Sequence, residues 1–440
     1  MSLPCRRWSA RLLALAMFYA GTLAHAEEPV VLPSGPSFSL NEALAQALLK
    51  NPSLQAHAFE ARVAEARILQ AGIRPNPELS ITAENFPGTG AFSGIKGLET
   101  TLQLSQLIDL GGARTRRIDE AVGERALVDA DYEMKRVDVF AEVAKRFTEV
   151  AAYAERLTAA HRARDLGEQT VAAVRKRVDA AALSPLELHK ARMALARLQI
   201  DEEHAEHELA SHRHSLAAIL GDDEPSFGPV RADLLTLPAV SEFTELAARL
   251  EKSPVLARFS LEARWREAQV RLAQSLRRSG TRVSGGLRRV EGTDDIGFVA
   301  GISIPLPLRD QNAGTIREAR ERRAQLGASA EALRLEMRAT LFDVYQEMQH
   351  ARTALTQLHQ EVIPFAEEAL QLADQGYRNG RFSLLELLDA QKSLIEFRGQ
   401  AVSYAATFHL HVIEIERLLG GPLQAPDAAP LNSPSLFSNP

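Results

Sequence analysis

Two acidic residues near the C-terminal end of the chain, Glu386 and Asp389, have a spacing that places both carboxylates on one face of a helix. They follow a break in the helical pattern at Asn379-Gly380, where a backbone with positive φ is easily adopted. Ser383 and Glu386 have the spacing of a capping box, which predicts a helix start here. Paired carboxylates attract cations, whereas acids in a first helical turn are also stabilised by the helix dipole. The sequence leaves both interpretations of the pair open.

Four histidines, the other side chains that could bind a cation, lie close together in one predicted helix: His204, His207, His212 and His214. Spacings of two and three residues can bring pairs of imidazoles near one ion. The simpler interpretation is the polar face of a helix rich in Ala, Glu and Arg, so we predict no bound metal. The sequence contains no nucleophile–base pair, phosphate-binding loop or zinc motif, and it indicates neither an enzyme nor a cofactor.

The helix predicted to begin at Ser383 has a counterpart 199 residues earlier, beginning at Ser184. At this offset Ser184-Pro-Leu-Glu-Leu188 aligns with Ser383-Leu-Leu-Glu-Leu387, and Leu220-Gly221 aligns with Leu419-Gly420. We therefore predict two structural repeats, residues 27–223 and 224–421, each with helices, one β-hairpin and long helices. The segment 422–440 is rich in Pro, Ser and Ala, and we predict a disordered tail.

The two β-hairpins are predicted near residues 78–108 and 282–304, where apolar and polar residues alternate. Strands of about ten residues can cross a bilayer when tilted. Two small soluble hairpins are the alternative, because alternation is a weak signal for any single strand. Four strands are too few to close a membrane barrel, since known barrels begin at about eight. If these strands span a membrane, the barrel must be shared among subunits.

The long segments that follow the hairpins are predicted to be helices with two apolar stripes, which favours packing against neighbours on both sides. We predict that these helices reverse direction at two places, Arg164-Asp165-Leu166-Gly167 and the segment containing Glu361, Val362 and Pro364. Glycine and proline are frequent at helix ends. Both reversals would lie far from the strands, so they should form tips that a partner protein can reach.

Residues 1–26 are typical of a secretory signal, with arginines before an apolar run over 12–20 and a small-x-small site at Ala24-His25-Ala26. The apolar run is too short for a membrane anchor. Cleavage after Ala26 would remove Cys5, the only cysteine, whose position before the apolar run does not suit lipidation. It would also remove three of the 51 basic residues and none of the 57 acidic ones, leaving a net charge of −9. Such a charge disfavours a nucleic-acid partner.

The duplication, the paired hairpins and the motif Tyr377-x-x-Gly380-x-x-Ser383-x-x-Glu386-Leu-Leu-Asp389-Ala-Gln391 resemble the TolC-like outer-membrane efflux proteins. Within that family, Asn76-Pro77-Glu78-Leu79, Glu84-Asn85-Phe86 and Leu110-Gly111-Gly112-Ala113-Arg114 resemble the CzcC-type branch, which serves cobalt-zinc-cadmium exporters. The resemblance implies a mainly α protein with a small β part. Long antiparallel coiled-coil helices would form a periplasmic α-barrel, and four strands per protomer would complete a shared trimeric β-barrel in the outer membrane.

The resemblance also implies a passive channel, not an enzyme, in a tripartite, proton-driven RND-type pump. The chain would assemble as a homotrimer in outer-membrane lipid. Its protein partners would be a periplasmic adaptor and an inner-membrane RND transporter, and no nucleic acid would bind. Divalent heavy-metal cations, exported from the periplasm or cytoplasm, are the expected substrates. Organic toxicants are the alternative substrate class, and a periplasmic coiled-coil adaptor or scaffold is the alternative class of protein.

The same resemblance assigns roles to residues of this sequence. The paired carboxylates at the narrow periplasmic mouth of such channels correspond to Glu386 and Asp389, with Tyr377 as a partner for closing the mouth. In the first repeat only Glu187 is retained, because Lys190 occupies the position that aligns with Asp389. The two predicted tips would point into the periplasm and contact the adaptor.

Overall fold

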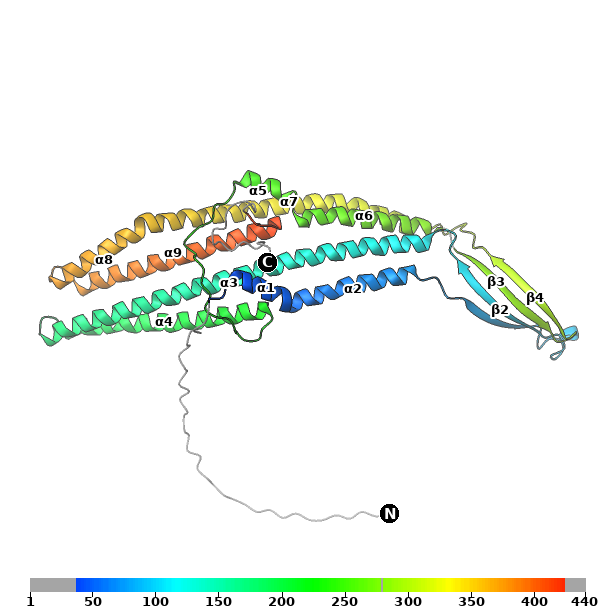
Figure 1. Cartoon of the computed structure of the whole chain (residues 1–440), viewed down its shortest axis with the longest axis horizontal. Helices are drawn as coiled ribbons and strands as arrows, with labels where there is room; N and C mark the ends of the chain where they lie inside the picture. The colour runs from blue at the N-terminus through cyan, green and yellow to red at the C-terminus, as the bar shows by residue number, and fades with distance from the viewer. Residues whose placement is uncertain (1–36, 278–279, 424–440) are drawn as a thin grey trace, which may run out of the picture.

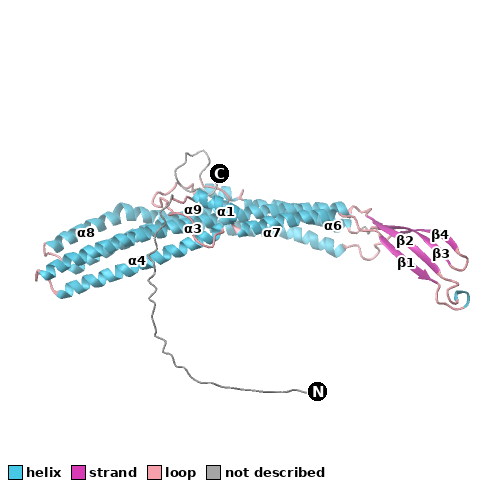
Figure 2. Ribbon diagram, turned by 60° about the horizontal axis from the view of Figure 1, so that its bottom comes forward, coloured by secondary structure: helices cyan, strands magenta, loops and turns pink. Residues whose placement is uncertain are grey.

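The computed structural model describes residues 37–277 and 280–423. The predicted signal at 1–26, the segment 27–36 and residues 424–440 of the predicted tail lie outside this part of the chain. The described residues form a long rod of helices that carries a four-stranded sheet at one end (Figure 1). The long helices and the strands occupy separate parts of the rod, and a short 3₁₀ helix, Gly90–Phe92, lies in the connection between the first two strands (Figure 2). This confirms the predicted fold class.

The two halves of the chain contain the same order of elements. The first half contains α1 (Leu40–Lys50), α2 (Pro52–Gly72), β1 (Glu78–Glu84), the short 3₁₀ helix Gly90–Phe92, β2 (Glu99–Ile108), α3 (Ala113–Asp179) and α4 (Pro185–Leu220). The second half contains α5 (Phe243–Leu250), α6 (Pro254–Ser275), β3 (Thr281–Val290), β4 (Asp295–Ser303), α7 (Ala313–Gln357), the π-helical turn Leu358–Val362, α8 (Ile363–Arg378) and α9 (Leu384–Leu419).

The starts of the helices follow the capping signals of the sequence. At α1, Ser39 and Glu42 form the expected capping box, and the backbone N–H of Ser39 donates to Glu42 Oε2 at 2.8 Å. At α9, Ser383 and Glu386 form a second capping box, in which the backbone N–H of Ser383 donates to Glu386 Oε2 at 2.6 Å. Each box satisfies backbone donors that a helix start leaves without partners.

The four strands pair antiparallel in the order β1-β2-β3-β4. Their register aligns side chains of like character in rows across the sheet. One row consists of Ile81, Leu102, Leu287 and Phe298. All four are exposed in the single chain, Phe298 by 93%. A large apolar row this open to water indicates a surface that another apolar phase or molecule covers.

The opposite face of the sheet is polar. Arg288 donates to Thr101 Oγ1 at 3.0 Å and to Glu99 Oε2 at 2.9 Å, and Gln103 donates to Ser284 Oγ at 2.8 Å. The sheet therefore has one apolar and one polar face, as the alternation in sequence predicts. Among the described residues, no helix combines the length and apolar character that a bilayer crossing requires.

The first of the two predicted reversals is wrong. Residues 164–167 lie inside α3, whose 67 residues form one uninterrupted helix of about 100 Å. Gly167 is buried, and a Cβ at this position would lie 2.9 Å from Leu198 Cδ1 and 3.2 Å from Leu195 Cδ1. The glycine thus permits close packing of α3 against α4 and does not end the helix. The chain reverses at residues 180–184, where Ala181 has a positive φ.

The second predicted reversal is wrong for a different reason. Glu361 and Val362 belong to the π-helical turn, and Pro364 lies in the first turn of α8. A proline has no backbone N–H to donate, and a widened turn before it accommodates its ring without ending the helical path. α7 and α8 accordingly follow one curved course (Figure 1). The reversal lies at residues 379–383, where Gly380 has a φ of 69°.

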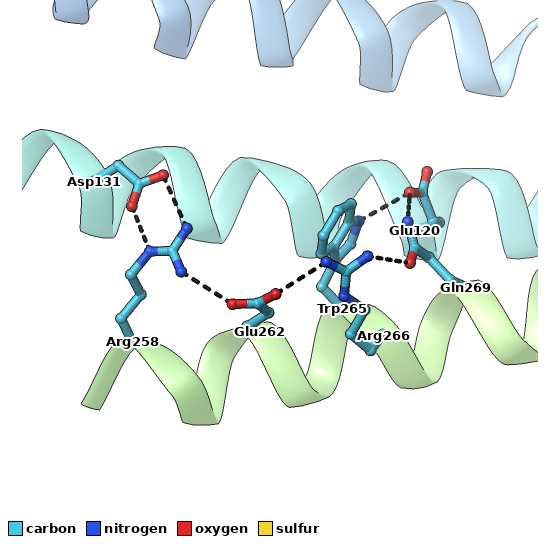
Figure 3. A network of polar contacts seen from close by, with 7 residues as sticks. All are labelled: Glu120, Asp131, Arg258, Glu262, Trp265, Arg266 and Gln269. Carbon is cyan, nitrogen blue, oxygen red and sulfur yellow. Dashed lines mark hydrogen bonds and ion pairs between the residues drawn. The ribbon is translucent and has the colours of Figure 1, made fainter. Parts of the chain in front are cut away.

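A polar network joins α3 to α6 (Figure 3). It contains seven residues: Glu120, Asp131, Arg258, Glu262, Trp265, Arg266 and Gln269. The Arg258 guanidinium contacts Asp131 of α3 and also Glu262, at 3.0 Å, on its own helix. Trp265 Nε1 donates to Glu120 Oε1 at 2.9 Å. These contacts fix α6, which leads into β3, on α3, which follows β2.

Candidate functional site

The end of the rod farthest from the sheet contains the sequence-predicted mouth residues (Figure 1). Two hairpins meet there, α3–α4 with its turn at 180–184 and α8–α9 with its turn at 379–383. A small apolar core joins them and consists of Val171, Val174, Ala191, Ala373, Tyr377, Leu384 and Leu387. We call these two turns and this core the helical tip. The corrected reversals thus place Tyr377, Glu386 and Glu187 directly beside the turns.

Tyr377 links the two hairpins of the helical tip. Arg177, near the end of α3, donates from Nη1 to the backbone carbonyl oxygen of Tyr377 at 2.8 Å. The same guanidinium lies over the Tyr377 ring, 4.8 Å from its centre. Burial raises the pKa of the Tyr377 hydroxyl, and Glu187 acts in the same direction while Arg177 opposes it. The phenol is therefore neutral at physiological pH, and the link is a cation–π contact plus one charge-assisted hydrogen bond.

Glu386 serves the start of α9. Its carboxylate accepts from the backbone N–H of Ser383 at 2.6 Å and from the Ser383 hydroxyl at 2.9 Å. These hydrogen bonds lower the pKa of Glu386, because they favour the charged carboxylate. The helix-start interpretation of Glu386 is therefore confirmed. The residue is exposed, so the charge that caps α9 also faces solvent at the tip.

Asp389 is exposed one turn further along α9 and takes no part in the capping box. Together with Glu386 it lines a groove between α8 and α9, whose other walls include Phe365, Phe382 and Phe397. The two carboxylates thus share one surface, as their spacing predicts. A pair of exposed acids in an otherwise apolar groove gives this part of the tip a negative potential.

Glu187, the first-repeat counterpart of Glu386, lies in the first turn of α4. Lys190 Nζ lies 3.2 Å from Glu187 Oε1. The two hairpins therefore differ in charge at the tip. The α9 start carries two exposed acids, whereas the α4 start carries one acid and its counter-ion.

Behind the tip, a row of polar contacts follows the seam between α3 and α9. Gln391 Nε2 donates to Thr170 Oγ1 at 3.0 Å in a buried environment, and Lys145 Nζ lies 2.6 Å from Glu414 Oε2. Burial opposes ionisation of Glu414, but hydrogen bonds from Arg417 and Lys145 lower its pKa to about 2. The seam gives the two halves of the chain a fixed register up to the tip.

The four histidines that the sequence singled out do not converge on one point. His204 and His207 each pair with a glutamate of their own helix, Glu208 at 3.6 Å and Glu203 at 3.3 Å. His212 lies against Tyr153 and Glu149 of α3, and His214 is exposed.

Sequence reasoning missed Arg177 as a partner of Tyr377. Arginines are frequent along α3, and only the folded hairpins show which of them reaches α8. The residue pair is 200 positions apart in the chain, so no local pattern could have identified it.

The fold defines a class of protein: a long helical channel component with a sheet at one end and the helical tip at the other. Residues 43–222 and 246–421 match the family model for the outer membrane efflux protein, and the chain belongs to this family. It is therefore an outer-membrane channel component with a periplasmic helical extension, not an enzyme. Channels of this family are trimeric and work with an adaptor and an inner-membrane transporter.

Among curated relatives, the chain is similar to the cobalt-zinc-cadmium resistance protein CzcC of Cupriavidus metallidurans. The two are 30% identical over 88% of this chain and 91% of that protein. The nickel and cobalt resistance protein CnrC of the same organism is 30% identical over 71% of this chain and 72% of its own length. Among solved structures, the outer membrane protein VceC of Vibrio cholerae has a TM-score of 0.70 at 20% identity, covering 88% of this chain and 97% of that one. These matches confirm the family resemblance that the sequence motifs indicated.

Proposed function

We propose that this chain forms the outer-membrane channel of a proton-driven, RND-type tripartite efflux system that exports divalent heavy-metal cations. The observation that carries the choice of substrate is the set of curated relatives, three of which are named for resistance to cobalt, zinc, cadmium or nickel. A passive conduit of this kind needs no cofactor. Organic toxicants are the alternative substrate class.

The sheet suits a lipid environment. Its exposed apolar row, Ile81, Leu102, Leu287 and Phe298, would face lipid, and its polar face would line the lumen of a barrel shared by three protomers. Four strands leave two open edges, which membranes do not tolerate. Sharing the barrel among subunits pairs these edges.

The helical tip would be the periplasmic constriction. In a threefold trimer, Glu386 and Asp389 would each be repeated as a ring of three acids, and such rings favour cations. Tyr377, held by Arg177 at 2.8 Å, would keep the α8–α9 hairpin against α3 in the closed mouth. Glu187 would add a weaker acidic contribution because Lys190 accompanies it.

The adaptor would contact the two turns at residues 180–184 and 379–383. These turns, unlike residues 164–167 and 361–364, form the end of the rod opposite the sheet. The repeated order of elements further supports a duplication, with repeats at 27–223 and 224–421 after a signal cleaved following Ala26.

The proposal is tested by metal tolerance in cells that keep the native adaptor and transporter but lack this chain. We expect such cells to lose tolerance to Zn²⁺, Co²⁺ or Cd²⁺ and to regain it when the chain is supplied. Unchanged metal tolerance together with increased sensitivity to dyes or antibiotics would assign the channel to organic substrates instead.

A further inference from the structure

Three metal-binding groups converge between α3 and α4, away from the helical tip. His161 on α3 faces Glu202 and Glu206, which lie four residues apart on α4, and their ligand atoms are all within 4.8 Å of one another. His161 Nε2 is 3.4 Å from Glu202 Oε1 and 3.9 Å from Glu206 Oε1. Two ligands about 2.1 Å from a tetrahedral ion are about 3.4 Å apart. The imidazole and carboxylates are therefore nearly at the separation that one ion requires.

This cluster differs from the other imidazole–carboxylate pairs along α4. His204 and His207 each lie near one glutamate of the same helix, and the Glu203 side chain is 64% exposed. The Glu202 side chain is only 11% exposed. A carboxylate this buried needs a compensating positive charge. His161 is also held by a different helix from the two carboxylates, so the three ligands are positioned by the packing of α3 on α4.

In the absence of metal, Arg164 supplies the compensating charge. Its Nη1 lies 2.7 Å from Glu202 Oε1. The same guanidinium also reaches Asp165 Oδ1 at 2.8 Å and lies 4.0 Å from Glu168 Oε1. Arg164 can therefore leave Glu202 and remain paired with acids of its own helix. The buried carboxylate would then be free for another cation.

We propose that His161, Glu202 and Glu206 form a binding site for a divalent transition-metal cation such as Zn²⁺, Co²⁺ or Ni²⁺, which displaces Arg164 from Glu202. One nitrogen and two carboxylate ligands suit these ions, with water completing the coordination. Mg²⁺ and Ca²⁺ prefer sites made of oxygen alone. A hollow of about 520 Å³ borders His161, and its charged lining includes Glu155, Asp233, Arg213 and Arg231.

The proposed metal site has a structural role that does not depend on the proposed export function. It lies within one hairpin and ties α3 to α4, so a bound ion would stabilise that hairpin whether or not the pore conducts metal. The metal ion and the Arg164 guanidinium compete for the same carboxylate, Glu202. Such competition weakens binding, as expected in a conduit that releases its cargo.

The test is titration of the full-length trimer, purified in detergent and stripped with a chelator, with Co²⁺ as the probe. The visible absorption of bound Co²⁺ depends on its ligands and indicates whether one of them is nitrogen. Added Zn²⁺ should displace the bound Co²⁺ and remove this absorption. We expect one saturable site per chain, no saturable site in His161→Ala, and about tenfold tighter binding in Arg164→Gln, where the competing charge is gone. Excess Mg²⁺ should not displace Co²⁺.

His207→Ala is the matched control, because it removes an imidazole that faces a single glutamate on the same helix. It should bind Co²⁺ as the wild type does. Equal binding by wild type and His161→Ala, or equal loss in both histidine variants, would overturn the proposal. Glu206→Gln, which leaves the buried Glu202 in place, should also lose the saturable site and provides a second test. Metal tolerance of cells is a separate readout, so failure of this site and failure of the export function can be told apart.

Discussion

The guanidinium of Arg177 both donates a hydrogen bond to the backbone carbonyl oxygen of Tyr377 and lies over the Tyr377 ring, 4.8 Å from its centre. One residue of α3 thereby holds the end of α8. The two hairpins of the helical tip are otherwise joined there by a small apolar core. Release of this one side chain is therefore a direct way to loosen the proposed mouth.

Arg177→Ala should open the mouth more often. A hydrogen bond to a charged group contributes about 1.5–3 kcal/mol, so its loss should shift a closed–open equilibrium about tenfold or more towards the open form. The measurement is single-channel recording in planar bilayers. Arg175→Ala, which alters an exposed arginine of the same helix, should behave as the wild type. Equal open probability in all three proteins would remove Arg177 from the account.

Asp389→Asn should weaken cation selectivity without weakening α9, because Asp389 lies outside the capping box. Glu386→Gln should weaken selectivity and also slightly lower the stability of the α9 start, because it removes the negative charge that the capping box and the helix dipole favour. Reversal potentials in salt gradients measure the first effect, and thermal unfolding measures the second.

The control for these acids is Glu396→Gln, since Glu396 is an exposed acid further along the same helix. Wild-type selectivity in the Glu386→Gln/Asp389→Asn double variant would show that neither acid controls the passage of cations. The proposed constriction would then lie elsewhere.

The lowered pKa of Glu414 predicts that the stability of the seam between α3 and α9 decreases in acid. Its pKa in the folded protein is about 2, below the ordinary value of 4.5. A lowered carboxyl pKa contributes stability above the ordinary value, and this contribution is lost as pH falls from about 4.5 to about 2. Glu414→Gln should therefore be less stable than the wild type at pH 6, and the difference should shrink as pH falls and nearly vanish only at about pH 2 or below. Thermal unfolding followed by circular dichroism tests this; a difference that is independent of pH would contradict it.

Gly167→Leu should destabilise the hairpin by about 1–3 kcal/mol, because the added atoms meet Leu198 and Leu195. Gly327→Leu, in a position on α7 with no atom within 4 Å of an added Cβ, should be neutral or stabilising, since leucine favours helices over glycine. Denaturant unfolding compares the two. Equal effects would show that Gly167 is not at a tight helix contact.

Local signals in the sequence predicted the parts of the fold that depend on neighbouring residues. The capping boxes at Ser39 and Ser383 and the alternation in the strands each involve residues a few positions apart, and the structure has both. The positive φ of Gly380 lies within the Asn379-Gly380 break that the sequence indicated.

The errors arose where a local signal had a tertiary cause. Gly167 looks like a helix end, but the residue that explains it, Leu198, lies on the next helix. Pro364 looks like a reversal, but the preceding π-helical turn lets the helix continue. For the same reason the cluster of His161 with Glu202 and Glu206 could not be found from spacing within one helix.

The central claim, export of divalent metal through this channel, is tested most directly by the rate at which preloaded cells lose Zn²⁺ or Co²⁺. Cell-associated metal would be followed over time by mass spectrometry in cells with the native adaptor and transporter, with and without this chain. The account predicts slow loss without the chain and restored loss when the wild-type chain is supplied. Equal rates of metal loss in both strains, with an organic toxicant retained only when the chain is absent, would contradict it.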